Sequence, residues 1–180
     1  MRRFTVLLLA VAVCIALPLF AQEKKDMAPS AMPPMPKPLN DDLLSWMVGE
    51  WEGTTTMSEG KSQDWQKVEW GLDNQFIMTT YSANLGGTMV YKGTGPTTVN
   101  PQTGEVVGYW FDNMRGMYKG TGKREGNKIM MTWEGTMGTR TDTTEKVGDD
   151  KFVVTFSSKD PSGKVSEGRT ELSRKKTAMK

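Results

Sequence analysis

Histidine is absent from this sequence of 180 residues, and cysteine occurs once, at Cys14. Without histidine the chain has no Ser-His-Asp or Cys-His catalytic set. The same two shortages exclude the usual zinc sites, which need several nitrogen or sulfur ligands. The sequence also contains no GxxxxGK[ST] phosphate loop and no EF-hand calcium loop. These absences favour a function without catalysis, metal or other cofactor.

The N-terminus is typical of a secretory signal peptide. Residues 1–21 carry Arg2 and Arg3, an apolar run from Phe4 to Phe20 and a small residue, Ala21, before a polar segment. The run is shorter than the ~20 residues of a spanning helix, so we expect no membrane span once the signal is removed. Cleavage after Ala21 also removes the cysteine, so the mature chain forms no disulfide of its own. We predict export to the periplasm or the extracellular medium, with an uncleaved anchor as the alternative.

Charge is balanced in the predicted mature chain. Two of the 23 basic residues, Arg2 and Arg3, leave with the signal, and the 21 that remain equal the 21 acidic residues in number. A neutral balance gives no general attraction to nucleic acid or anionic membranes. The basic run at the C-terminus, SRKKTAMK, ends in a tail at 175–180 that we expect to be solvated. No nucleic-acid partner is predicted.

The predicted mature chain begins with a segment that has no apolar period. Residues 22–38, QEKKDMAPSAMPPMPKP, are rich in proline and methionine, and we expect a disordered linker there. A short helix, DDLLSWM at 41–47, should follow, with Asn40 as its cap and acidic residues in its first turn. The folded domain is placed at 39–174.

Beyond Gly49 the sequence has the composition and turn spacing of an all-β protein. Threonine, valine, methionine and aromatic residues dominate, and turn signals such as NPQTG and DPSG recur roughly every 8 to 14 residues. Several segments alternate in polarity, for example Ile129, Met131 and Trp133 on one face. This spacing predicts ten strands, at 50–58, 63–71, 75–83, 88–98, 105–112, 115–123, 127–134, 138–147, 151–158 and 164–173.

Every connection between these predicted strands is short enough for a hairpin. No connection is therefore long enough for a Greek-key crossover. Closing the sheet into a barrel would also remove the two exposed edge strands of an open ten-strand sheet. We predict an all-β fold, an antiparallel meander β-barrel of about ten strands with one short N-terminal helix.

The stretch VGEWEG resembles the Gly-x-Trp motif with which lipocalin and other calycin barrels begin. The resemblance implies that Gly49 lets the chain turn into the first strand and that Trp51 plugs the closed end of the barrel. In those families a basic side chain near the end of the last strand lies across the indole, and here the matching residue is Arg174. Such a contact contributes ~0.5–2 kcal/mol.

A second resemblance covers about residues 43–173. The segments LLSWMVGEWEG, VVGYWFDNM and MYKGTGKREGNKIMMTWEG are similar to the bacterial family known as domain of unknown function 1579. That family is thought to be lipocalin-like, so the resemblance implies a fold and adds no activity. Related barrels that bind haem use a histidine ligand, which this chain does not have.

The predicted function is the binding of one small, mostly apolar molecule inside the barrel. Barrels of eight to ten strands hold such a ligand or are filled by their own side chains. Two of the predicted pocket residues, Asp112 and Arg140, are polar and would anchor the ligand. Each also has an ordinary structural explanation: Asp112 could form an Asx turn, and Arg140 could face solvent. The predicted pocket residues are Trp70, Met78, Met89, Tyr91, Trp110, Asp112, Met131, Trp133 and Arg140.

Three alternatives stay open. A filled barrel would serve as a structural or protein-interaction module. Two carboxylates facing each other across a cavity would permit hydrolysis. The 13 methionines outside the signal could bind Cu(I), which prefers soft ligands, although strand methionines more simply fill an irregular apolar interior.

Overall fold

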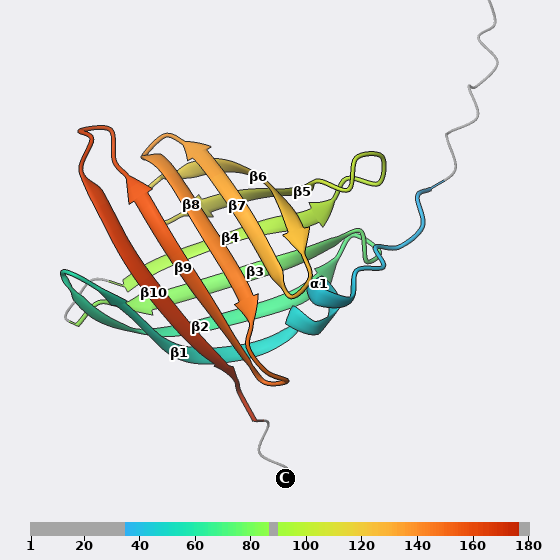
Figure 1. Cartoon of the computed structure of the whole chain (residues 1–180), viewed down its shortest axis with the longest axis horizontal. Helices are drawn as coiled ribbons and strands as arrows, with labels where there is room; N and C mark the ends of the chain where they lie inside the picture. The colour runs from blue at the N-terminus through green and yellow to red at the C-terminus, as the bar shows by residue number, and fades with distance from the viewer. Residues whose placement is uncertain (1–34, 87–89, 177–180) are drawn as a thin grey trace, which may run out of the picture. The chain divides into compact units, whose positions relative to one another are not determined.

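The computed structural model describes residues 35–86 and 90–176, which form one helix and ten antiparallel strands (Figure 1). The elements are α1 (Asp42–Met47), β1 (Gly49–Met57), β2 (Gly60–Gly71), β3 (Phe76–Asn84), β4 (Val90–Val99), β5 (Val106–Asp112), β6 (Met117–Glu125), β7 (Lys128–Gly135), β8 (Gly138–Lys146), β9 (Lys151–Lys159) and β10 (Val165–Arg174). All ten predicted strands are present, and their ends lie within three residues of the predicted ones.

The strands form a closed meander barrel. Each strand pairs with its neighbours in sequence, and β10 returns to pair with β1. The closing register joins Trp51 to Arg174 and Thr55 to Thr170; in Figure 1, β1 and β10 lie side by side. The predicted fold, an all-β antiparallel meander barrel with a short N-terminal helix, is confirmed.

Strand alternation separates the barrel wall into an inner and an outer face. On β2, Ser62, Asp64 and Val68 are buried inside, whereas Gln63 and Glu69 are exposed outside. The apolar core lies at the end of the barrel where β1 begins. Its buried members are Leu43, Leu44, Trp51, Val68, Ile77, Val106, Ile129, Met131, Phe152 and Leu172.

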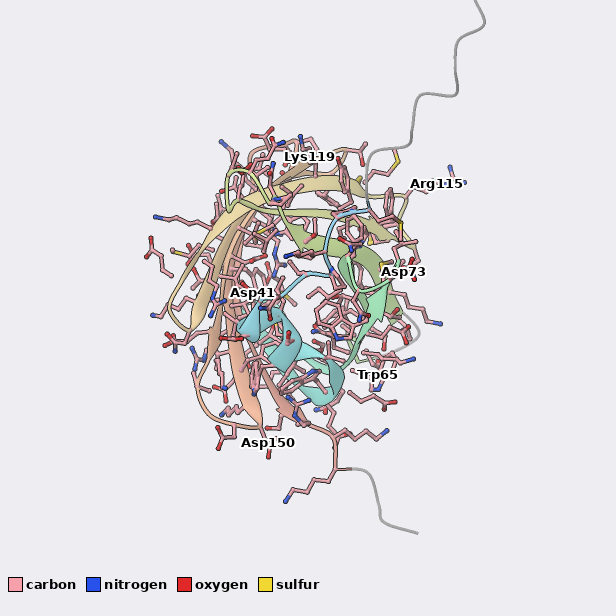
Figure 2. The ribbon with its side chains drawn as sticks, turned by 90° about the vertical axis from the view of Figure 1, so that its right-hand side faces the viewer. Asp41, Trp65, Asp73, Arg115, Lys119 and Asp150 are labelled. Carbon is pink, nitrogen blue, oxygen red and sulfur yellow. The ribbon has the colours of Figure 1, made fainter. Side chains whose placement is uncertain are left out.

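Helix α1 lies across this end of the barrel, as Figure 2 shows from that side. Leu43 and Leu44 are buried beneath it. The cap is Asp41 and not the predicted Asn40, because the Asp41 carboxylate accepts hydrogen bonds from the N–H groups of Leu43 and Leu44 at 2.9 Å each. Asp41 also forms an ion pair with Arg124.

Trp51 and Arg174 hold α1 in place. The Trp51 indole is fully buried, and its N–H donates to the carbonyl of Met47 at 2.8 Å. The Arg174 guanidinium lies 4.1 Å from the centroid of that ring, and it donates to the carbonyls of Trp46 and Val48 at 2.7 and 2.8 Å. The last strand is thereby tied to the carbonyl groups at the helix C-terminus.

The backbone conformation at position 49 explains why this residue is a glycine. Its φ is +142°, a value that residues with a side chain rarely adopt. A Cβ there would also lie 2.5 Å from Arg174 Nη1. Gly49 therefore lets the chain pass from α1 into β1 directly beside the arginine.

Several sequence predictions lie outside the described residues. They are the signal peptide at 1–21, most of the linker at 22–38 and the end of the tail at 175–180. Pro36–Lys180 is one compact unit, and of the unit before it the structure describes only Met35. Within the described ranges, no helix is both long and apolar enough to cross a membrane.

Candidate functional site

The barrel encloses a cavity of about 560 Å³. Its closed end is lined by Leu44 and Met47 of α1, together with core residues such as Phe152 and Leu172. At the other end the lining includes Met114 and Met137, from the β5–β6 and β7–β8 turns, which are 54% and 45% exposed. The cavity therefore reaches the surface at the end opposite α1.

The cavity is open because two tryptophans lie against the wall. The indole of Trp110 covers Gly93 on β4, the next strand, where a Cβ would lie within 2.7 Å of several ring atoms. Trp133 covers Gly120 and Gly108 in the same way, on β6 and β5. Each of these glycines faces inward, so the absence of a side chain leaves room for a flat ring. The two rings thus line the interior without filling it.

A buried cluster of hydroxyl groups surrounds one carboxylate on the β1–β3 side of the cavity. Asp64 is 5% exposed and accepts hydrogen bonds from Ser62 Oγ at 2.5 Å, from Tyr81 Oη at 2.8 Å and from Thr55 Oγ1. Thr170 joins through Thr55, at 2.6 Å. We call these five residues the Asp64 cluster. Its hydroxyls satisfy both carboxylate oxygens, as a buried carboxylate requires.

A second polar group lies on the opposite wall. Asp142 accepts hydrogen bonds from Trp133 Nε1 at 2.9 Å and Arg140 Nε at 3.2 Å, both at Oδ2. The Arg140 guanidinium also stacks 3.9 Å from the centroid of the Phe156 ring. Burial raises the pKa of Asp142, and the charge of Arg140 partly opposes that rise. Trp133 is therefore held against the wall at both its face and its N–H.

A third polar group lies near the open end. Asp112 Oδ1 accepts from the backbone N–H groups of Met114 and Gly116, at 2.9 and 2.7 Å, so the carboxylate organises the β5–β6 turn. Its other oxygen accepts from Tyr91 Oη at 3.4 Å, and both residues line the cavity. Tyr91 Oη in turn accepts from Trp110 Nε1 at 2.8 Å. Asp112 is thus both an Asx-turn residue and part of the cavity lining.

We expect the protein to lose stability at alkaline pH because of two partly buried tyrosines, Tyr81 beside Asp64 and Tyr91 beside Asp112. Burial, with a smaller contribution from Asp112, raises the pKa of Tyr91 from 10.0 to about 12, and burial also raises the pKa of Tyr81. Above about pH 10 the unfolded chain loses these protons while the native chain keeps them, so stability should fall as the pH rises toward about 12. Urea unfolding across this range measures the slope. Tyr91→Phe should flatten it, and an equal slope in both proteins would contradict this assignment.

Six of the nine predicted pocket residues line the cavity: Tyr91, Trp110, Asp112, Met131, Trp133 and Arg140. Trp70 lies on the inner face in phase with Val68 and packs against the core cluster, but it does not line the cavity. Met78 lies on the outer face, because its neighbours Ile77 and Thr79 face in, and its side chain packs over Gly71. Neither Trp70 nor Met78 is a lining residue, contrary to prediction. Met89 lies outside the described residues.

The Asp64 cluster was not predicted from the sequence. One signal for it was present, since Ser62, Asp64 and Gln66 alternate in phase with Val68, an apolar residue on a predicted face. The inward glycines were also not recognised as part of the site. The motif YKGTG occurs at 91–95 and again at 118–122, and its first glycine is Gly93 or Gly120, the two positions that the indoles cover.

Among the described residues that line the cavity, we see no arrangement of side chains typical of a catalytic site. The three interior carboxylates, Asp64, Asp112 and Asp142, each have their own protein donors, and no hydrogen bond joins one to another among the described residues. In the same part of the chain, no three acidic residues gather closely enough to hold a metal ion. The polar groups are therefore arranged to hold side chains and to present donors and acceptors to the cavity.

No family model and no curated protein matches this chain. The solved structures that resemble it in fold include those of two proteins, CPES and Rv2717c. The S-type phycobiliprotein lyase CPES from Guillardia theta is 10% identical, with a TM-score of 0.56 over 74% of this chain and 91% of that one. Rv2717c from M. tuberculosis is 15% identical, with a TM-score of 0.59 over 77% and 99%. The chain thus shares a closed antiparallel β-barrel fold with these two proteins, and sequence identities this low show a common fold and nothing about function.

Proposed function

We propose that this protein is an exported, non-enzymatic binding protein that holds one small, mostly apolar molecule inside its barrel. The observation that carries the proposal is the cavity of about 560 Å³, which is kept open by tryptophans lying on glycines. Ligand pockets in proteins measure about 300–1,000 Å³ and are mostly apolar, with a few fixed polar groups. Export rests on the pattern of residues 1–21, and membership of the family of domain of unknown function 1579 rests on the three sequence segments quoted above.

The filled-barrel alternative requires the large interior side chains to meet at the centre. Trp110 and Trp133 instead lie along the wall, and Trp70 packs against the core cluster. Burial of an apolar body gives about 25 cal/mol for each Å² removed from water. A ligand that reaches the apolar closed end therefore gains most of its affinity there, and the polar groups set its orientation.

A bulky side chain near the entrance of the cavity should weaken binding. Ala83 on β3 is 5% exposed and lines the cavity toward the open end, next to Asp64 and Tyr91. We expect one Nile red molecule per chain to bind the wild type, and Ala83→Trp to weaken binding by at least about tenfold. Fluorescence titration measures both. Thr80→Trp, on the exposed outer face of the same strand, is the matched control and should bind as the wild type does.

The natural ligand can be sought directly. Native mass spectrometry of the protein purified from the organism that encodes it should show a stoichiometric small molecule, and solvent extraction should release it. If the wild type carries no molecule and also fails to bind Nile red, the proposed binding function is wrong. A role as a structural or protein-interaction module would then explain the protein better.

A further inference from the structure

Among the described residues, Arg140 is the one arginine that lines the cavity. The side chain is 36% exposed and lines the cavity, while the adjacent Thr141 faces outward. Its Nε is occupied by Asp142 and its flat face by the Phe156 ring. Among the described residues, Nη1 and Nη2 make no hydrogen bond, and neither is a buried, unsatisfied atom. Two hydrogen-bond donors are thus presented to whatever enters.

The charges around Arg140 limit which acceptor can bind there. Asp112 and Asp142 line the same cavity as Arg140. The other charged lining residues, Lys159, Asp160 and Lys164, lie at the end of β9 and in the turn that leads to β10. An anionic group at Nη1 or Nη2 would lie beside the Asp142 carboxylate, which already accepts a hydrogen bond from Arg140 Nε. Like charges in a partly dry interior repel strongly. The pair Arg140–Asp142 is already neutral as a unit.

A cationic ligand group fits no better. The oxygens of Asp64 are occupied by the hydroxyls of its cluster, and those of Asp112 by its own turn and Tyr91. Of the oxygens of these three carboxylates, Oδ1 of Asp142 remains, and an ammonium there would lie beside the Arg140 guanidinium. The free N–H groups of Arg140 therefore favour a ligand whose hydrogen-bond acceptor is uncharged.

The position of Arg140 also sets where the rest of the ligand lies. Strand β8 runs from the open end at Gly138 toward the closed end, with Arg140, Asp142 and Thr144 facing inward along it. Arg140 and Thr144 are four residues apart, which is roughly 13 Å along the strand. Below them lies the apolar lining of Ile77, Ile129, Phe152 and Leu172. A ligand held at Arg140 by one end thus has its apolar body in the closed half.

We propose that the ligand is an uncharged, elongated apolar molecule with a carbonyl oxygen at one end, which accepts a hydrogen bond from Arg140 while the apolar end points toward α1. This inference rests on the proposed binding function and adds the chemical class and the orientation of the ligand. Arg140 acts here as the residue that selects the head group.

Four probes with the same number of carbon atoms test the head group: undecane, 2-undecanone, undecanoic acid and undecylamine. Calorimetric titration near neutral pH should show the ketone binding about tenfold tighter than undecane, the effect of one hydrogen bond to a charged donor. The ketone should also bind tighter than the acid and the amine. If the acid or the amine binds tightest, the head-group inference is wrong and the binding function stands. If none of the four binds, the binding function itself fails.

Two variants connect the preference to Arg140. Arg140→Leu combined with Asp142→Leu removes the ion pair without leaving one charge buried alone, and should reduce the preference for the ketone over undecane to within about threefold. Arg169→Leu is the matched control, because Arg169 pairs with Glu171 two residues on in the same way but on the outer face. It should keep the full preference. An unchanged preference in the double variant, with its fold verified by circular dichroism, would overturn the proposal.

Discussion

Trp51→Ala is expected to lower the free energy of unfolding by about 3–5 kcal/mol, the usual cost of removing a large, fully buried aromatic side chain. The Trp51 ring packs edge-on against Phe152, with centroids 4.8 Å apart, and lies 5.1 Å from the Trp46 ring. Its N–H bond to Met47 and its contact with Arg174 would be lost as well. One substitution therefore removes the packing of the closed end and the support for α1 together.

Urea unfolding of the wild type and the variant measures this loss. Trp65→Ala is the matched control, because Trp65 lies on the outer face of β2 and is only half-buried. We expect that variant to lose less than about 1.5 kcal/mol, in the range of substitutions away from the core. A similar loss in both proteins would mean that the closed end does not depend on Trp51.

The architecture could be predicted because turn chemistry and alternation are local. Glycine, proline, asparagine and aspartate mark the hairpins directly in the sequence, for example NPQTG between β4 and β5. The helix cap was misplaced by one residue, since Asn40 and Asp41 are both good caps and only the backbone decides between them. Asp41 is the cap because its carboxylate reaches the N–H groups of Leu43 and Leu44.

The openness of the interior could not be predicted in the same way. Alternation places Trp110 and Trp133 on the inner face, but a ring that faces inward can point to the centre or lie along the wall. The choice depends on the residue across the strand pair, and Trp133 lies directly opposite Gly120 in the register of β6 and β7. Register between strands is a tertiary property, so the role of the glycine was visible only in the structure.

The Asp64 cluster was missed for a related reason. A polar residue in a strand is normally assigned to the outer face, and Asp64 is flanked by Gln63 and Trp65, which gives no clear contrast. Its burial is tolerated because hydroxyl groups on β1, β2, β3 and β10 meet around it. Thr170 is far from Asp64 in sequence, and barrel closure brings the two strands to either side of β1.

Filling the space beneath an indole should both destabilise the barrel and close its cavity. In Gly120→Val the new Cβ would lie 2.5–2.7 Å from three ring atoms of Trp133, so the ring must move inward and its bond to Asp142 must break. We expect a loss of about 1–3 kcal/mol, as for other overpacked interiors. Nile red binding should weaken with it, because the displaced ring occupies the cavity.

A double-mutant cycle with Trp133→Ala separates this clash from other effects of the valine. Without the indole, valine at position 120 meets no ring and, as a good strand residue, should cost little or nothing. We therefore expect a coupling energy of about 0.5–3 kcal/mol between the two positions, measured by urea unfolding of the four proteins. Gly148→Val is the control, since a Cβ there has no atom within 4 Å. Additive losses in the cycle would show that Gly120 does not make room for Trp133, and the physical basis for an open cavity would fall with it.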